Sequence, residues 1–245
     1  MFDHLIAHRG EPARWPENSL NAFRAVMQAG ARFVETDVQI SSDRVPVLSH
    51  DDSLLKLTGQ DLRVADTALA DIRALNAGQT DVFGDRFDTD RVATLAELAG
   101  LLAQFPDVRA FIELKAAAIE AFGVETAVDL TLEACAAGRD QCIPISFDDR
   151  ALRRVRGKTD LAIGWVLPAW DDQTRRVADV LAPAYLFVNR KLIPGTDTVL
   201  WPGPWQWVVY TANTSADIKR LLDRGSDLVE TDDIRQMARE LAGRS

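Results

Sequence analysis

Short apolar runs alternate with longer segments in which apolar residues recur every three or four positions. Short runs of this kind are typical of buried β-strands, and the longer pattern is typical of amphipathic helices. Eight runs have the length and composition of strands: Leu5–Ala7, Phe33–Ile40, Arg109–Leu114, Gln141–Ile145, Leu161–Val166, Tyr185–Asn189, Trp207–Tyr210 and Leu228–Thr231. Their alternation with helical segments predicts βα units and a parallel sheet.

The helical segments follow most of these strands. The first is expected to begin after Ser19, which can cap its start, and to end near Gly30. Similar patterns predict helices at Leu95–Leu102, Ile119–Ala137, Ala151–Val155, Val177–Leu181, Ile218–Leu222 and Ile234–Leu241. The segment from Pro194 to Pro204 is rich in Pro and Gly, so its helix is expected to be short or absent.

The number of units and the chain length point to one fold class. Eight strands and 245 residues predict an α/β fold, a (β/α)8 TIM barrel, which typically spans about 250 residues. Residues 1–245 would then form a single domain. The alternative is a doubly wound open sheet, because it is built from the same alternation of strands and helices.

One segment interrupts the alternation after the second predicted strand. From Asp51 to Arg91, and out to about residue 94, the chain carries scattered charges, three glycines and only weak periodicity. Long loops in compact domains are often functional. In a barrel this insertion would lie over the C-terminal face, where ligands bind, so we expect it to border the substrate pocket.

Composition and charge narrow the class of protein. The formal net charge is −9, and an acidic surface repels polyanions, so nucleic acid is not an expected partner. Cys135 and Cys142, the two cysteines, fit neither a disulfide framework nor a zinc site and are expected to be buried free thiols. Neither a leader nor a membrane-spanning run is evident, so we expect a cytoplasmic protein without a membrane anchor. The oligomeric state stays open.

Three carboxylates lie on predicted strands. Side chains alternate along a strand, so Glu35 and Asp37 project from the same face. Inside a barrel, two such charges would need a cation, whereas on a surface they would simply face solvent. Glu113 shares a face with Lys115 in an apolar strand, either as a surface ion pair or as a third carboxylate. An all-oxygen cluster of three would suit a hard cation such as Mg²⁺ or Ca²⁺.

The three histidines fall within the first fifty residues. His4 is near the N-terminus, while His8 and His50 end short apolar runs. Histidine exchanges protons near neutral pH, so a pair beside a phosphodiester could act as base and acid, although a single strand-end histidine is commonly a packed or surface residue. Arg9 offers a guanidinium that pairs well with phosphate, and Gly10 leaves room for a ligand to approach the backbone.

Taken together, these motifs resemble those of the glycerophosphodiester phosphodiesterase family. The matching segments are Ile6-Ala7-His8-Arg9-Gly10, Pro16-Glu17-Asn18-Ser19, Ala22-Phe23, Glu35-x-Asp37, His50-Asp51 with the following seven residues Asp52 to Thr58 and Gly59, Thr94-Leu95-Ala96-Glu97-Leu98 and Ile112-Glu113-Leu114-Lys115. The resemblance implies a TIM barrel with an insertion after the second strand. It also implies hydrolysis of small-molecule glycerophosphodiesters, such as glycerophosphocholine or glycerophosphoethanolamine, to glycerol 3-phosphate and an alcohol.

The same resemblance implies a metal site. Glu35, Asp37 and Glu113 would hold one divalent cation, with help from the nearby Glu17. Mg²⁺ is the expected metal, and Ca²⁺ is the alternative.

The resemblance further implies roles in catalysis and binding. His8 and His50 would form the acid/base pair. Arg9 and Lys115 would contact the phosphate, and Tyr210 would line the pocket for the alcohol. The metal would take another phosphate oxygen and offset the charge of the transition state.

The second half of the chain departs more from the family pattern. Tyr210-Thr211-Ala212-Asn213 stands where Trp-Thr-x-Asn is common. Glu230 occupies a commonly neutral position in the stretch from Gly225 to Asp233. Two alternatives therefore stay open. One is a related phosphodiester cleavage, on lysophospholipids or through a cyclic phosphate, and the other is a catalytically silent barrel that binds a phosphorylated metabolite or a partner protein.

Overall fold

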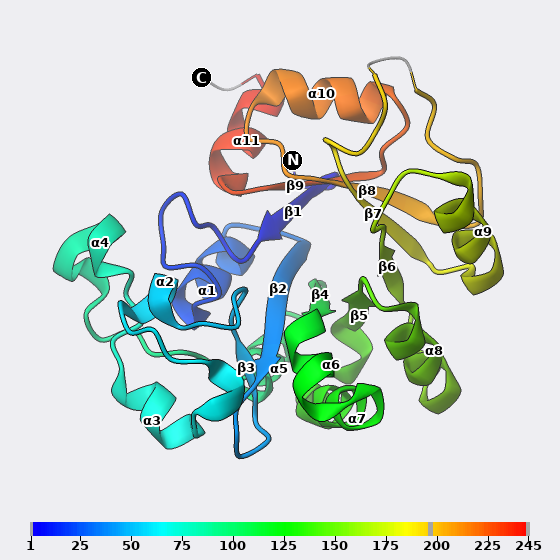
Figure 1. Ribbon diagram of the computed structural model, residues 1–245. Helices are drawn as coiled ribbons and strands as arrows, with labels where there is room; N and C mark the ends of the chain where they lie inside the picture. The colour runs from blue at the N-terminus through cyan, green and yellow to red at the C-terminus, as the bar shows by residue number, and fades with distance from the viewer. Residues whose placement is uncertain (1, 196–197, 244–245) are drawn as a thin grey trace.

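Eight parallel strands close into a barrel in the computed structural model, which describes residues 2–195 and 198–243 (Figure 1). The strands are β1 (Leu5–His8), β2 (Phe33–Ile40), β4 (Arg109–Leu114), β5 (Cys142–Ser146), β6 (Gly164–Val166), β7 (Tyr185–Asn189), β8 (Gln206–Tyr210) and β9 (Leu228–Thr231). Strand β1 pairs in parallel with both β2 and β9, and this pairing closes the sheet. The predicted TIM barrel is confirmed, and the open doubly wound sheet is wrong.

Four strands differ from their predicted extent, and in β1, β5 and β8 the bounds differ by a single residue at one or both ends. β6 begins at Gly164 rather than at Leu161, and Leu161 N–H instead donates to the side-chain hydroxyl of Thr159 in a turn. An additional strand, β3 (Pro46–Leu48), pairs antiparallel with β2 and forms a hairpin at the barrel rim. This hairpin sets the position of His50, which follows it directly.

Helices surround the barrel (Figure 1). They are α1 (Leu20–Gln28), α5 (Leu95–Leu102), α6 (Ala116–Phe122), α7 (Val124–Ala134), α8 (Asp149–Lys158), α9 (Asp172–Leu181), α10 (Ser215–Asp223) and α11 (Ile234–Leu241). Ser19 caps α1 as expected, by accepting from Ala22 N–H. The single helix predicted over 119–137 is wrong. It is broken at Gly123, whose φ of 79° is left-handed, and residues 136–141 form the 3₁₀ helix η3 (Ala136–Gln141). Between β7 and β8, the described residues contain no helix.

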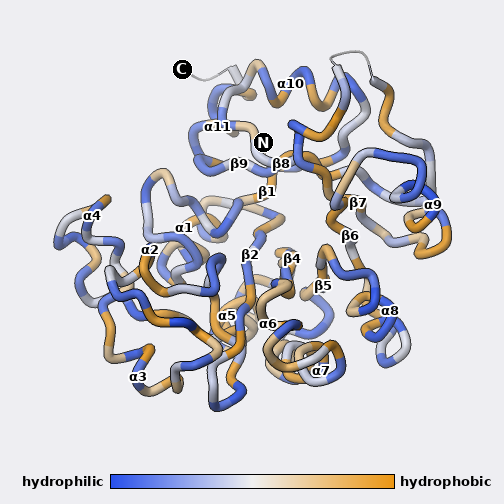
Figure 2. The backbone as a smooth tube through the Cα atoms, in the orientation of Figure 1, coloured by the Kyte–Doolittle hydropathy of each residue, from blue (hydrophilic) through white to orange (hydrophobic). Residues whose placement is uncertain are grey.

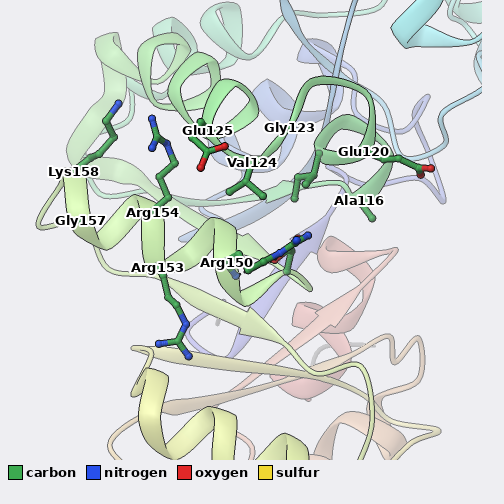
Figure 3. A pocket seen from close by; sticks show the side chains of 12 residues that line it. Ala116, Glu120, Gly123, Val124, Glu125, Arg150, Arg153, Arg154, Gly157 and Lys158 are labelled. Carbon is green, nitrogen blue, oxygen red and sulfur yellow. Dashed lines mark hydrogen bonds and ion pairs between the residues drawn. The ribbon is translucent and has the colours of Figure 1, made fainter.

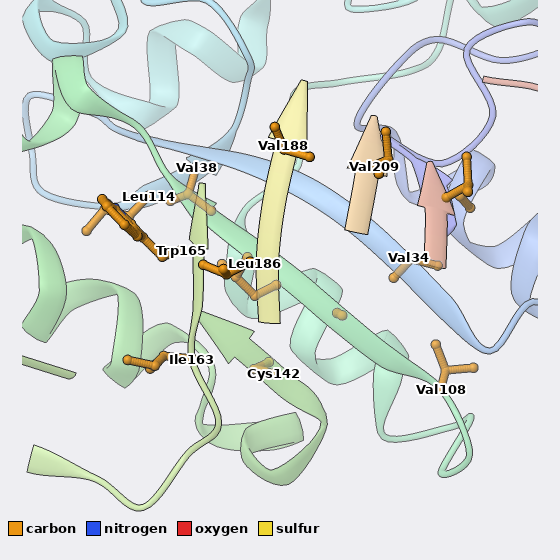
Figure 4. Close-up of a cluster of buried hydrophobic side chains, with 14 of the residues drawn as sticks. Val34, Val38, Val108, Leu114, Cys142, Ile163, Trp165, Leu186, Val188 and Val209 are labelled. Carbon is orange, nitrogen blue, oxygen red and sulfur yellow. The ribbon is translucent and has the colours of Figure 1, made fainter. Parts of the chain in front are cut away.

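Two apolar cores fill the two faces of the barrel sheet. On the outer face of the barrel, side chains of the strands project into the main core, which packs against the helices. Examples are Val34 and Val38 of β2 and Leu186 and Val188 of β7 (Figure 4). The helices are correspondingly amphipathic, with hydrophobic and hydrophilic residues alternating along them (Figure 2). The two cysteines are buried within the main core as free thiols, as expected.

A second apolar cluster, here called the aromatic plug, fills the interior of the barrel. Its buried members are Ile6, Phe111, Ile143, Ile145, Val166, Phe187, Val208 and Leu228. Phe111 lies at its centre and makes edge-on contacts with Phe187 at 5.0 Å and Tyr185 at 4.9 Å between ring centroids. Burial of one such ring stabilises the fold by roughly 1.5–3 kcal/mol. The interior of the barrel is therefore packed with side chains rather than open as a channel.

The insertion after β2 is folded rather than irregular. It contains α2 (Leu55–Thr58), η1 (Val64–Asp66), α3 (Leu69–Ala74), α4 (Thr80–Phe83) and η2 (Gly84–Phe87). A small apolar cluster joins these turns to β3 through Leu54, Ile72 and Val47. The insertion lies beside α1 and the β2–β3 hairpin (Figure 1). In the part of the chain that the structure describes, no helix is long and apolar enough to cross a membrane.

Candidate active site

A cavity of about 280 Å³ opens at the C-terminal ends of the barrel strands. Its lining residues are His8, Arg9, Glu35, His50, Glu113, Lys115, Ile145, Phe147, Val166, Phe187, Asn189, Tyr210, Thr211 and Glu230. The charged members come from β9, β1, β2, β3 and β4 or the residues that follow them, and the apolar members come from β5, β6 and β7. The cavity therefore has a charged side and an apolar side.

A larger hollow, of about 960 Å³, lies between α6, α7 and α8 (Figure 3). Its basic side chains are already paired. Arg150 lies 2.6 Å from Asp148, and Arg154 and Lys158 both lie within 2.7 Å of Asp129. Because these charges are neutralised at an exposed surface, this hollow has no convergent chemistry. The candidate active site is the smaller cavity in the barrel.

Three carboxylates gather on the charged side of the cavity. Glu35 and Asp37 project from the same face of β2, and Asp37 lies opposite Glu113 in the pairing with β4. One oxygen from each lies within 4.8 Å of the others. Glu35 and Asp37 are buried, at 3% and 1% exposure. This grouping matches the all-oxygen set that hard divalent cations prefer.

The electrostatics of the three carboxylates also fit a cation. Burial, with the nearby charges of Asp37 and Glu230, raises the pKa of Glu35 well above its ordinary value. Burial likewise raises the pKa of Glu113. Burial opposes ionisation of Asp37 too, but the positive charges of Arg9 and then Lys115 outweigh it and lower its pKa. A divalent cation would replace the protons that Glu35 and Glu113 tend to hold.

Arg9 is held against the carboxylates by an unusual backbone. Its φ of 49° is left-handed, and its N–H donates to Glu35 Oε2 at 3.3 Å. Its Nε lies 3.0 Å from Asp37 Oδ2 as an ion pair without hydrogen-bond geometry, and its Nη1 lies 3.5 Å from Glu17 Oε2. Because Arg9 also lines the cavity, its guanidinium can meet an anion there.

Lys115 provides a second positive charge. Its Nζ lies 2.8 Å from Glu113 Oε1 and 3.2 Å from Asp37 Oδ1. Burial lowers the pKa of Lys115, but the charges of Glu113 and Asp37 outweigh this effect and raise it to about 12. Lys115 therefore stays charged beside the place where a phosphate would bind.

Glu17 lies outside the group of three carboxylates. Its Oε2 pairs with Arg9 and with Lys56 Nζ at 2.6 Å, and its backbone N–H donates to Gln79 Oε1. Lys56 and Gln79 belong to the insertion. The lining of the cavity includes no residue of the insertion, whose contacts reach Glu17 and, through Asp51, His50. That the insertion borders the bound substrate stays a prediction.

His8, at the end of β1, is oriented by a carboxylate that is distant in the sequence but adjacent in space. Its Nδ1 lies 2.7 Å from Asp232 Oδ1, and Asn213 Nδ2 donates to the other oxygen of Asp232. Its Nε2 therefore faces the cavity, 3.9 Å from Glu35 Oε2. Burial lowers the pKa of His8, but the hydrogen bond to Asp232 and the charge of Glu230 outweigh burial and raise it.

His50 has the same kind of partner. Its Nδ1 lies 2.7 Å from Asp51 Oδ1, and its carbonyl accepts from Gln39 Nε2. The side chain is 34% exposed, compared with 15% for His8. Each histidine thus uses Nδ1 for a carboxylate, which leaves Nε2 for a substrate. His4, the third histidine, instead pairs through Nδ1 with the carbonyl of Asp227, outside the cavity lining.

Three residues at the site had no role assigned from the sequence. Asp232 orients His8 as described. Asn18 donates from Nδ2 to Asp37 Oδ2 at 3.1 Å and accepts from the Thr36 hydroxyl. Glu230, on β9, lines the cavity with 3% exposure, and burial raises its pKa to about 7. All three stand in the family-like motifs, but the motifs alone did not say what their side chains contact.

Comparisons with known proteins point to one family. The model of the "Glycerophosphoryl diester phosphodiesterase family" matches residues 8–236. A glycerophosphodiester phosphodiesterase of Caldanaerobacter subterraneus subsp. tengcongensis is 29% identical over 94% of this chain and 93% of its own length. A crystal structure of a putative glycerophosphoryl diester phosphodiesterase from Silicibacter pomeroyi is 26% identical, with a TM-score of 0.81 over 98% of this chain and 93% of that one.

A further structure supports the fold. The phosphodiesterase of Oleispira antarctica, in complex with the product sn-glycerol-3-phosphate, superimposes with a TM-score of 0.84 at 24% identity. The alignment covers 98% of this chain and 96% of that one.

Proposed function

The chain belongs to the glycerophosphoryl diester phosphodiesterase family of phosphoric diester hydrolases. From this premise we propose that it hydrolyses glycerophosphodiesters, such as glycerophosphocholine, to glycerol 3-phosphate and an alcohol. The reaction would require a divalent cation. One observation carries the proposal. The cavity combines three carboxylates within 4.8 Å of one another with two histidines whose Nδ1 atoms are bound to carboxylates. Such a set can bind a cation and move two protons at one phosphodiester.

The metal in this proposal is Mg²⁺, with Ca²⁺ as the alternative. Glu35, Asp37 and Glu113 would hold it, because their oxygens converge and their charges exceed those of Arg9 and Lys115. When bound, the cation would offset the negative charge of the phosphate. Glu17 supports this site by positioning Arg9 rather than as a member of the carboxylate group.

His8 and His50 would transfer the protons. In direct hydrolysis, the Nε2 atom of one histidine takes a proton from water, whose oxygen forms a bond to phosphorus. The bond from phosphorus to the alcohol oxygen breaks, and that oxygen takes a proton from Nε2 of the other histidine. Arg9 and Lys115 would hold the phosphate, and Tyr210 would line the pocket beside it.

Two further proposals concern the substrate and the route. A related cleavage of lysophospholipids, or a route through a cyclic phosphate, uses the same residues. Reaction in ¹⁸O-labelled water, with cyclic product followed by phosphorus NMR, separates the two routes.

The alternative of a catalytically silent barrel is disfavoured, because every proposed metal, phosphate and proton-transfer position holds a competent residue type. A single domain and a cytoplasmic location stay predictions from the sequence.

A direct assay tests the proposed activity. Purified protein is incubated with glycerophosphocholine and glycerophosphoethanolamine in the presence of Mg²⁺, Ca²⁺ or EDTA, and released glycerol 3-phosphate is measured. We expect release with a metal and none with EDTA. No release from either substrate under any metal condition would show that the substrate assignment is wrong.

A further inference from the structure

Glu230 is a buried carboxylate that faces the cavity. It is 3% exposed and lines the cavity from β9. Across residues 2–195 and 198–243, no hydrogen bond or ion pair at its side chain is present. A buried polar group without a partner costs about 1–3 kcal/mol, and more when charged. Since only the cavity is open to this carboxylate, its natural partner is a bound ligand.

Two more polar groups with free donors stand beside Glu230. Strands β8 and β9 pair Val209 with Val229, which places Tyr210 next to Glu230, and β7 pairs Asn189 with Tyr210. Asn189 uses its Oδ1 to accept from the backbone of Lys191, and its Nδ2 has no partner among the described residues. A carboxylate, a phenol hydroxyl and an amide NH₂ therefore line the same wall.

This wall lies next to the proposed phosphate site and is formed by residues other than the three proposed metal-binding carboxylates, although Glu230 is near enough for its charge to raise the pKa of Glu35. Strand β1, which carries His8, is flanked by β2 on one side and by β9 on the other. Glu35 and the metal-binding group lie on the β2 side, whereas Glu230 lies on the β9 side. A substrate whose phosphate meets Arg9 and Lys115 would place one of its two ester groups against Glu230.

The burial of the two ends of the cavity indicates which ester group this is. Phe147, on the apolar side, is 42% exposed and lies at the mouth, where an alcohol group of varying size has room. Glu230 itself is 3% exposed, so the wall around it suits a small group that carries hydrogen-bond donors. Glycerol fits this description, since its two neighbouring hydroxyls can both donate to one carboxylate.

We propose that Glu230, with Tyr210 and Asn189, binds the two hydroxyls of the glycerol group and so selects diesters that carry a vicinal diol. This inference rests on the proposed phosphodiesterase function. It makes Glu230 a specificity-determining residue for that reaction. A hydrogen bond to a charged group contributes about 1.5–3 kcal/mol, which corresponds to roughly a 10- to 150-fold preference for the diol over an analogue that lacks one hydroxyl.

The test compares two substrates that differ by one hydroxyl. The kcat/KM values of glycerophosphocholine and of the analogue 3-hydroxypropylphosphocholine are measured with Mg²⁺ for the wild type, Glu230→Leu and Glu230→Gln. We expect the wild type to prefer the diol by roughly 10- to 150-fold, Glu230→Leu to lose nearly all of this preference, and Glu230→Gln to keep part of it. The exposed Glu120→Gln variant serves as the control and should keep the full preference.

A second pair of substrates tests the competing possibility that Glu230 binds a cationic head group. Glycerophosphocholine is compared with glycerophosphoethanol, whose head group carries no positive charge. If Glu230→Leu lowers the preference for choline but leaves the preference for the diol intact, the inference is overturned. If Glu230→Leu lowers kcat/KM equally for glycerophosphocholine, 3-hydroxypropylphosphocholine and glycerophosphoethanol, the inference is likewise overturned, because an equal loss indicates a general structural defect.

A binding measurement separates this inference from the proposed function. Calorimetry compares glycerol 3-phosphate with 3-hydroxypropyl phosphate, in the wild type and in Glu230→Leu. Absence of turnover on every diester, together with a diol preference in binding that Glu230→Leu abolishes, would contradict the proposed function and support the subsite. Turnover without any diol preference in binding or in kcat/KM would contradict the subsite and leave the proposed function standing.

Discussion

The two sides of the barrel cavity are built from the same kind of strand end but carry opposite chemistry. On one side, β9, β1, β2, β3 and β4, with the residues that follow them, present four carboxylates, two histidines and two cationic side chains. On the other side, β5, β6 and β7 present Ile145, Phe147, Val166 and Phe187. From this difference we propose that bond cleavage takes place on the charged side, while the apolar side shapes the pocket. Changes on the first side should therefore alter turnover, and changes on the second should mainly alter binding.

Removing either histidine from the charged side should have the largest effect. We expect His8→Ala and His50→Ala each to lower kcat by about 10²- to 10⁴-fold, because each loses a proton-transfer group. Metal affinity, measured by calorimetry, should change little in either variant. Retention of near wild-type kcat in both variants would refute the acid/base assignment.

Glu230 should give the charged side a pH-dependent cost in stability. Burial raises its pKa to about 7 in the folded protein from 4.5, so the folded state binds more protons than the unfolded state between these values. Stability contributed by this group therefore falls as pH rises from about 4.5 to about 7, by up to about 3 kcal/mol. Glu230→Gln should be more stable than the metal-free wild type at pH 8 and should lose this advantage below pH 4.5. Urea unfolding across pH measures the difference, and a constant difference would contradict the account.

Asp232→Asn should have a smaller effect on turnover, because Asp232 acts through His8. We expect a loss of roughly 10- to 100-fold in kcat, the range found when a hydrogen-bonded partner of a functional histidine is removed. In a His8→Ala background the same substitution should cause no further loss. A full additional loss in that background would show that Asp232 does not act by positioning His8.

The apolar side should show the smallest effect. Phe147 is partly exposed and touches no proposed metal, phosphate or proton-transfer group among the described residues. Phe147→Ala should raise KM by about 2- to 10-fold for glycerophosphocholine through lost apolar contact, with kcat nearly unchanged. A fall in kcat comparable to that of the histidine variants would remove the distinction between the two sides.

The barrel could be predicted well from the sequence, because strands and helices are indicated by the pattern of apolar residues within each short segment. Alternation in Phe33–Ile40 sufficed to place Glu35 and Asp37 on one face, and the observed strand has the same bounds. The helix predicted over 119–137 failed at Gly123, since periodicity continues across a single residue with left-handed backbone. β6 is shorter than its apolar run, because a turn at Thr159 takes part of that run out of the sheet.

The candidate site was predictable only in part. Residue types and order indicated the carboxylates and histidines, but the partner that orients His8 lies 224 positions away, and no local pattern connects the two. Glu230 is similarly brought to the cavity by the pairing of β1 with β9, and Asn18 reaches Asp37 from the loop that follows β1. The contacts of the insertion with Glu17 were not predictable for the same reason, because Lys56 and Gln79 lie 39 and 62 positions from it.

The central claim is that Glu35, Asp37 and Glu113 hold a divalent cation that diester hydrolysis requires. The most direct test titrates metal-free protein with Mg²⁺ while glycerol 3-phosphate release from glycerophosphocholine is followed. We expect saturable activation through one site in the wild type and in the exposed control Asp71→Asn, and no activation above the EDTA background in Asp37→Asn. Full activity of the wild type in EDTA, or unchanged activation of Asp37→Asn, would contradict the claim.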